Sequence, residues 1–142
     1  MDGADHHVKV FPARLSALPA VSAFTEHVGR AAGFDRGTSL RLCLLLEELF
    51  TNTVLHGHGR DSDEPVTLAF DVAPGRIALT YEDTGPPHDP FAAVSAPDER
   101  LSIEDRPVGG LGLPLVAGMA ADVQYQRVEG QNRISLVVTA SG

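Results

Sequence analysis

The chain has 142 residues, of which 43% are hydrophobic and 21% charged, and a formal net charge of −8 at pH 7; this length and composition predict one globular domain over residues 1–142. The negative charge argues against direct nucleic-acid binding, which depends on clustered lysine and arginine. No apolar run approaches the roughly 18 residues needed to cross a membrane, and a single cysteine with a polar, acidic start predicts a cytoplasmic protein without membrane contact.

The first half of the chain predicts one strand and two helices. A short strand is expected over Val8–Phe11, and apolar residues then recur at helical spacing from Leu15 to Gly33. The second helix is predicted to begin at an N-cap of Thr38 or Ser39 and to end at Gly57–Gly59.

Turn residues in the second half predict two hairpins. The strands of the first cover residues 66–72 and 76–82, joined by Ala73–Gly75. The strands of the second cover residues 122–128 and 132–139, joined around Glu129 and Gly130.

A long loop and a third helix separate the hairpins. The proline-rich loop runs from Asp83 to about Pro107, with residues 86–107 expected to form a lid, because loops of this length are usually lids or binding loops. A third helix is predicted from Gly110 to about Ala120. Short turns between consecutive strands favour a mostly antiparallel sheet, so the fold class is α+β: a two-layer sandwich with about three helices on one face.

The second predicted helix carries a polar row of Glu48, Asn52 and His56 among leucines. Residues four apart share a helix face, so a carboxylate, an amide and an imidazole align over roughly 12 Å. This pattern is typical of a helix that forms the floor of a polar pocket. The simpler interpretations are a solvated edge for Glu48, an ordinary buried amide for Asn52 and a structural histidine for His56.

Two further segments point to nucleotide chemistry. Gly109–Leu113 lies at the start of the predicted third helix, where bare backbone amides and the positive helix end suit phosphate. Asp83 follows a strand, and its carboxylate suits the exocyclic amine of adenine, with Gly85 leaving room for close approach. Asn52 offers an amide oxygen, a ligand type that Mg²⁺ favours. A plain turn at Asp83 and a hinge at 109–112 are the alternatives.

At these spacings the chain resembles the GHKL, or Bergerat-fold, ATPases, and among them the anti-sigma-factor serine kinases of the RsbW and SpoIIAB type. Residues 48–57 are similar to the family's N-box, Asp83–Gly85 to its adenine box and Gly109–Leu113 to its phosphate-side glycine box. The resemblance covers nearly the whole chain, from about Val8 to Thr139.

The resemblance implies ATP and Mg²⁺ as cofactors and a role for each matched residue. Asn52 would hold Mg²⁺, Asp83 would recognise adenine with Gly85 beside it, and Glu48 would act as the base. The phosphates would be covered by the glycine box and approached by a cation of the loop. The residues implied for this phosphate side are Gly110, Leu111, Gly112 and Arg106, with Arg100 as the other loop cation.

The resemblance also implies a function and partners. The protein would be a serine kinase that phosphorylates a small anti-anti-sigma protein of the STAS type, sequesters a sigma factor and forms a homodimer. The alternative is a non-catalytic module that binds a nucleotide and a partner. Departures from the family pattern are Pro86–Pro87 at the start of the loop and the absence of a clear late-strand threonine, for which Ser135 and Thr139 are the candidates.

A metal hydrolase is the competing interpretation. Its candidate ligands would be side chains clustered near the end of the second helix and the start of the long loop. These are His56, His58, Asp61, Asp63 and His88.

Overall fold

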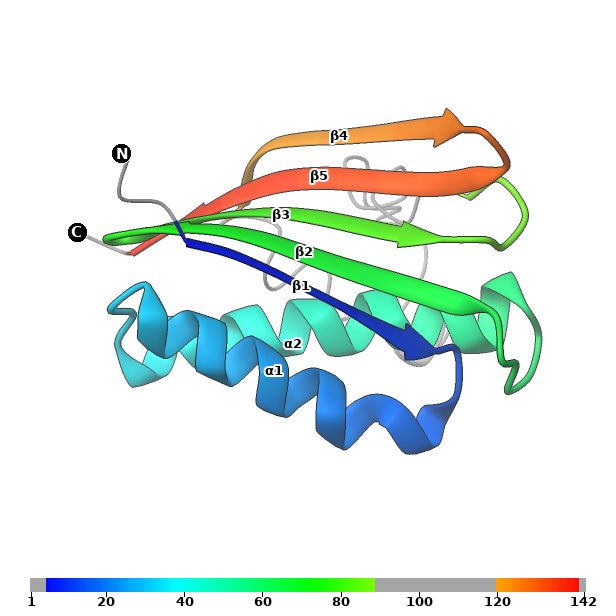
Figure 1. The fold of residues 1–142 in the computed structure, drawn as a ribbon, viewed down its shortest axis with the longest axis horizontal. Coiled ribbons are helices and arrows are strands. Elements are labelled where there is room, and N and C mark those ends of the chain that lie inside the picture. Colours follow the sequence, from blue (N-terminus) through cyan, green and yellow to red (C-terminus); the bar gives the residue numbers. More distant parts are fainter. Residues whose placement is uncertain (1–4, 89–119, 141–142) are drawn as a thin grey trace, which may run out of the picture.

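The computed structural model describes residues 5–88 and 120–140, which form a sheet with helices packed against one face (Figure 1). The elements in chain order are β1 (Asp5–Pro12), the 3₁₀ helix η1 (Leu15–Ala17), α1 (Leu18–Ala31), α2 (Arg36–Asn52), the π-helical turn η2 (Thr53–Gly57), β2 (Pro65–Ala73), β3 (Arg76–Asp83), β4 (Ala120–Val128) and β5 (Gln131–Thr139).

The five strands form one sheet in the order β1-β2-β3-β5-β4, and neighbouring strands are antiparallel throughout. This confirms the predicted α+β class and both hairpins. The expected third helix lies outside the described residues except for its last residue, Ala120, which opens β4. The strand therefore begins two residues earlier than the predicted start at Asp122.

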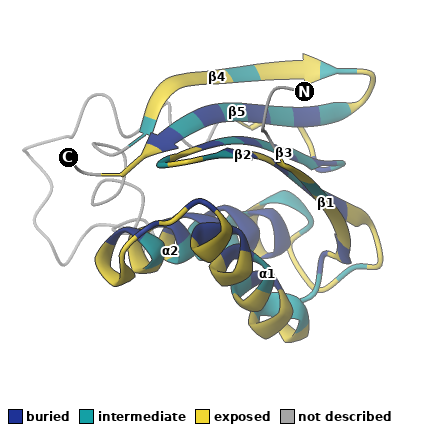
Figure 2. Cartoon of the chain, turned by 60° about the vertical axis from the view of Figure 1, so that its left-hand side comes forward, coloured by how far each residue is buried: buried dark blue, intermediate teal, exposed yellow. Residues whose placement is uncertain are grey.

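The core fills the space between the sheet and the two α-helices, and Figure 2 shows the buried faces turned toward each other. Buried residues alternate along β2 and β3, as expected when one face of a sheet packs on helices. The buried apolar side chains of α2 are Leu42, Leu45, Leu46, Leu49 and Phe50. None of the described helices is both long enough and apolar enough to cross a lipid bilayer.

The start of α2 differs from the sequence prediction. Asp35, not Thr38 or Ser39, is the N-cap: it has extended backbone angles, and its Oδ1 accepts a hydrogen bond of 2.7 Å from the amide of Thr38. Thr38 therefore contributes the capped amide, and the helix begins at Arg36. Aspartate is among the strongest N-cap residues, because its carboxylate also faces the positive end of the helix dipole.

The end of the second helix also differs. A regular α-helix was expected to reach Gly57, but the last turn is a π-helix in which the amide of His58 donates to the carbonyl of Thr53 at 2.9 Å. Such wide turns are frequent at functional sites. This one places Thr53 and Gly57 against a hollow beside the end of β3.

Candidate functional site

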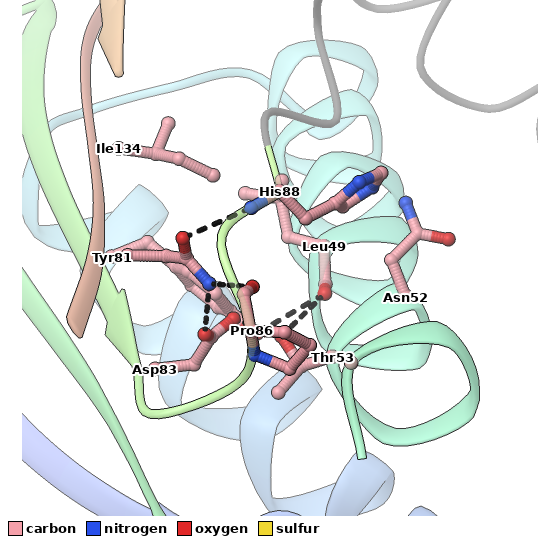
Figure 3. A pocket seen from close by; sticks show the side chains of 10 residues that line it. Leu49, Asn52, Thr53, Tyr81, Asp83, Pro86, His88 and Ile134 are labelled. Atoms are coloured by element: carbon pink, nitrogen blue, oxygen red, sulfur yellow. Dashed lines mark hydrogen bonds between the residues drawn. The ribbon is translucent and has the colours of Figure 1, made fainter. Parts of the chain in front are cut away.

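A small pocket, partly open to solvent, lies where the end of α2, the end of β3 and the start of β5 meet (Figure 3). Its lining combines apolar walls with a few converging polar groups, as in many small-molecule sites. The lining residues are Leu49, Asn52, Thr53, Gly57, Tyr81, Asp83, Pro86, His88, Asn132 and Ile134.

Asp83 is the buried charged group of this lining. Its Oδ1 accepts hydrogen bonds from the backbone amide of Gly85 at 3.0 Å and from the side-chain amide of Asn132 at 2.9 Å. Its Oδ2 accepts from the hydroxyl of Thr53 at 2.8 Å. The bond to the amide two residues ahead makes Asp83–Gly85 an Asx-turn, which explains locally why this sequence turns as β3 ends.

A chain of hydroxyl groups supports Asp83 from beneath. The Tyr81 hydroxyl lies 2.6 Å from Thr53 Oγ1 and 3.1 Å from the carbonyl oxygen of Leu49. Burial, as the largest cause, raises the pKa of Tyr81, so its hydroxyl keeps its proton and acts as a donor. When Tyr81 donates to Thr53, the single Thr53 proton is free for Asp83.

Asn52 lines the pocket on the helix side, whereas His56 does not. Figure 3 shows the His88 ring pointing toward the Asn52 side chain, and that side chain makes no hydrogen bond to any other residue drawn there. His56 is exposed and absent from the lining. Of the predicted polar row, Asn52 therefore faces this pocket and His56 does not.

Glu48 lies one helical turn before Asn52 and is half-buried. Its Oε2 is buried without a hydrogen-bond partner among the described residues, and it is not part of the pocket lining. Burial and, to a lesser extent, the neighbouring Glu47 raise the pKa of the Glu48 carboxyl. Glu47 itself accepts a hydrogen bond of 2.9 Å from Ser22 on α1, so it joins the two helices.

Gly85 packs against the π-helical turn. A Cβ added at this position would lie 3.4 Å from both Gly57 Cα and Asp83 Oδ1. An alanine would thus fill the remaining space, and a larger side chain would collide with backbone. The glycine matters here for its close approach to Gly57.

The phosphate side of the predicted site, with the lid and the glycine box, lies outside the described residues. It comprises Gly110, Leu111, Gly112, Arg100 and Arg106. The two candidates for the late-strand threonine are described: Ser135 faces the side of the sheet opposite to its neighbour Ile134, which lines the pocket, and Thr139 is exposed at the far end of β5.

The metal-hydrolase interpretation finds no support in residues 5–88 and 120–140, which include all five of its candidate ligands. No group of three or more histidine, cysteine or acidic side chains there is arranged to hold a metal ion. Both candidate carboxylates are engaged elsewhere: Asp63 pairs with Arg14 at 2.7 Å, and Asp61 accepts from the amide of Leu15 at 2.8 Å.

Sequence reasoning missed Thr53 and Asn132, which hydrogen-bond Asp83, and Tyr81, which supports Thr53. A signal existed for Tyr81, which precedes Asp83 by two residues on the same strand face. The position of Asn132 opposite Asp83 depends on the β3–β5 register, which only the structure shows.

Comparisons with known proteins identify the family and the fold of the chain. The family model described as histidine kinase-like ATPase domain matches residues 11–138. The serine/threonine-protein kinase BtrW of Bordetella bronchiseptica is 28% identical over 124 residues, which make up 86% of this chain and 87% of BtrW.

A solved structure of the RsbU and RsbW domains of Rv1364c from Mycobacterium tuberculosis superposes with a TM-score of 0.61 and 16% identity over 96% of this chain. The present chain spans only 33% of the length of that larger protein chain. At this identity the likeness shows a shared fold.

Proposed function

The chain belongs to the family of histidine kinase-like ATPase domains, as its resemblance to the GHKL ATPases predicts, and on this premise we propose that it binds ATP in the pocket around Asp83 and transfers the γ-phosphate to a serine of a partner protein. The observation that carries the proposal is the buried Asp83 carboxylate, oriented by three hydrogen bonds at the wall of that pocket.

Asp83 accounts for the choice of purine. A carboxylate accepts a hydrogen bond from the 6-amino group of adenine but meets the 6-carbonyl of guanine unfavourably, because both groups are acceptors. A buried polar group left without a partner is costly, and such sites reject the wrong ligand strongly. Gly85 and Gly57 keep the neighbouring backbone close to this wall.

The residues present fit a magnesium ion beside the phosphates. Asn52 offers an amide oxygen in the pocket, and hard oxygen ligands are those that Mg²⁺ prefers. A bound ion would neutralise part of the phosphate charge during transfer. Gly110, Leu111, Gly112 and Arg106 are proposed to complete the phosphate side.

Glu48 is proposed as the general base. Its buried oxygen has no partner among the described residues, and its raised pKa makes the carboxylate a stronger proton acceptor. In the proposed step, the serine oxygen of the partner forms a bond to the γ-phosphorus while its proton passes to Glu48. The bond from that phosphorus to the β–γ bridging oxygen breaks, and ADP leaves.

The proposed acceptor is a small anti-anti-sigma protein of the STAS type, and the second partner is a sigma factor that the chain sequesters. The similarity to BtrW, a serine/threonine-protein kinase, supports the kinase activity, and the choice of partners rests on the resemblance to the anti-sigma-factor kinases. A homodimer and a cytoplasmic location are part of the same proposal.

Phosphotransfer from radiolabelled ATP to a panel of STAS proteins encoded near this gene tests the proposal. We expect label on a serine of one of them, and loss of transfer with Glu48→Gln. The matched control is Glu47→Gln, which alters the neighbouring carboxylate that contacts Ser22. Transfer that survives Glu48→Gln would remove Glu48 from the role of base.

A nucleotide-dependent binding module is the second candidate, favoured by the position of Glu48 outside the pocket lining and by the exposed Pro86–Pro87 pair. Such a module would bind ATP or ADP and a partner with ordinary affinity but transfer no phosphate. Nucleotide binding without any labelled partner across the panel would select this function over the kinase.

A further inference from the structure

Asn132 on β5 is the most highly connected side chain of the pocket. Its Nδ2 donates to Asp83 Oδ1 at 2.9 Å and to the carbonyl of Pro86 at 2.8 Å. Its Oδ1 accepts from the backbone amide of His88 at 3.1 Å, from Arg127 at 3.3 Å and, in a shorter bond, from the Tyr125 hydroxyl. Only 4% of the residue is exposed.

These partners fix the orientation of the Asn132 amide. Each of its Nδ2 partners is an acceptor, and the His88 amide and the Arg127 guanidinium on its Oδ1 side can only donate. A flipped amide would set its NH₂ against these donors and its oxygen against two acceptors. The side chain therefore presents a donor to Asp83 in a single, fixed geometry.

Within residues 5–88 and 120–140, the hydrogen bonds of Asp83 leave one acceptor position open. A carboxylate has about four lone-pair sites, two on each oxygen. Gly85 and Asn132 occupy both on Oδ1, and Thr53 occupies one on Oδ2. The remaining Oδ2 site matches a ligand that brings a single N–H, such as the 6-amino group of adenine.

Asn132 also holds the chain that follows Asp83. Its bonds to Pro86 and His88 fasten this segment to the β4–β5 hairpin, and Arg127 on β4 adds a 2.6 Å bond to the carbonyl of Gly85. This segment carries Pro86 and His88 into the pocket lining. The Asn132 amide therefore fixes the positions of both the Asp83 carboxylate, which is proposed to recognise adenine, and the adjacent pocket wall.

We propose that Asn132 is a positioning residue for purine selection: it saturates Oδ1 of Asp83, so that only Oδ2 can accept the amine of adenine. This inference rests on the proposed ATP binding and adds to it a residue that determines selectivity. An aspartate at this position would replace the donor by a second acceptor. An alanine would leave one of the two acceptor sites on Asp83 Oδ1 without a donor.

The test compares ATP with purine riboside triphosphate, which differs from ATP only in lacking the 6-amino group. Calorimetry on Asn132→Ala and Asn132→Asp should show ATP affinity reduced by about tenfold or more, as expected when a hydrogen bond to a charged group is misaligned. The amine-free analogue should lose at least about threefold less affinity than ATP, because the loosened wall affects both nucleotides whereas the misaligned carboxylate affects only ATP. Ser135→Ala, on the same strand but the opposite face, should leave both affinities unchanged.

The outcomes separate this inference from the proposed function. Equal losses for both nucleotides would mean that Asn132 is merely structural and would overturn the inference, as would variants that keep the wild-type preference for ATP. A wild-type chain that binds neither nucleotide would overturn the proposed function and this inference together.

A measurement on the wild-type chain covers the case in which the variants do not fold. The side-chain amide signals of Asn132 in ¹⁵N NMR spectra should shift more on saturation with ATP than with the analogue, because only ATP adds a donor to the Asp83 carboxylate. Equal shifts with both nucleotides would contradict the proposed role.

Discussion

The hydroxyl of Thr53 on η2 donates a hydrogen bond of 2.8 Å to Oδ2 of Asp83 at the end of β3, which ties the helix layer to the sheet at the wall of the pocket. Both residues are buried, and the Tyr81 hydroxyl lies on the other side of Thr53 at 2.6 Å. The carboxylate is therefore held in place by the fold itself, before any ligand binds.

Replacing Thr53 by valine removes this hydroxyl while keeping the shape of the side chain. We expect the free energy of unfolding to fall by about 1–3 kcal/mol, because Asp83 and Tyr81 each lose a buried partner. Urea denaturation measures this. The control is Thr25→Val: Thr25 is also buried, but its only hydroxyl partner in the described part of the chain is the carbonyl of Val21 in its own helix. An equal decrease in the free energy of unfolding in the two variants would contradict the account.

Asn52→Ala should abolish the strengthening of ATP binding by Mg²⁺. The variant loses the amide oxygen that faces the pocket but leaves the Asp83 region intact. Calorimetric titration with ATP, with and without Mg²⁺, measures the effect, and the Mg²⁺-free affinity of the same variant is the internal control. His56→Ala, at an exposed position on the same helical segment, should keep the Mg²⁺ dependence. A full Mg²⁺ effect in Asn52→Ala would place the ion elsewhere.

The raised pKa of Glu48 predicts a pH-dependent stability difference. Because burial raises this pKa above its ordinary value of 4.5, the folded chain binds the proton more tightly than the unfolded chain does. The stabilising contribution of the protonated form is present below pH 4.5 and is lost as the pH rises through the folded pKa. Glu48→Gln does not titrate, so its stability relative to wild type should increase above pH 4.5. A stability difference that is constant from pH 4 to pH 8 would contradict the burial of this carboxyl.

Much of the fold followed from local chemistry. The turn around Glu129 and Gly130 was predictable from Gly130, because glycine readily takes the positive φ that two-residue hairpin turns require. Both residues have positive φ angles, of 50° and 80°. The helix start was misplaced because several residues in 35–39 can cap a helix, and only the observed bond from Thr38 to Asp35 decides between them.

The candidate site was predictable in part. Asn52 and Asp83 belong to recognisable sequence motifs, and both residues line the same pocket. The support of Asp83 was not foreseen, because Thr53 and Asn132 are respectively 30 and 49 residues away and reach it only through tertiary packing. The π-helical turn was also missed, since helical periodicity carries no signal for a single wide turn.

Calorimetric titration of ATP and GTP into the wild-type chain and into Asp83→Asn tests the central claim most directly, namely that Asp83 recognises adenine in this pocket. The account predicts that wild type prefers ATP by about tenfold or more and that Asp83→Asn loses this preference, because an amide cannot accept from all three donors and the ligand amine together. Equal affinity of the wild-type chain for ATP and GTP, or an ATP preference that Asp83→Asn retains, would contradict it.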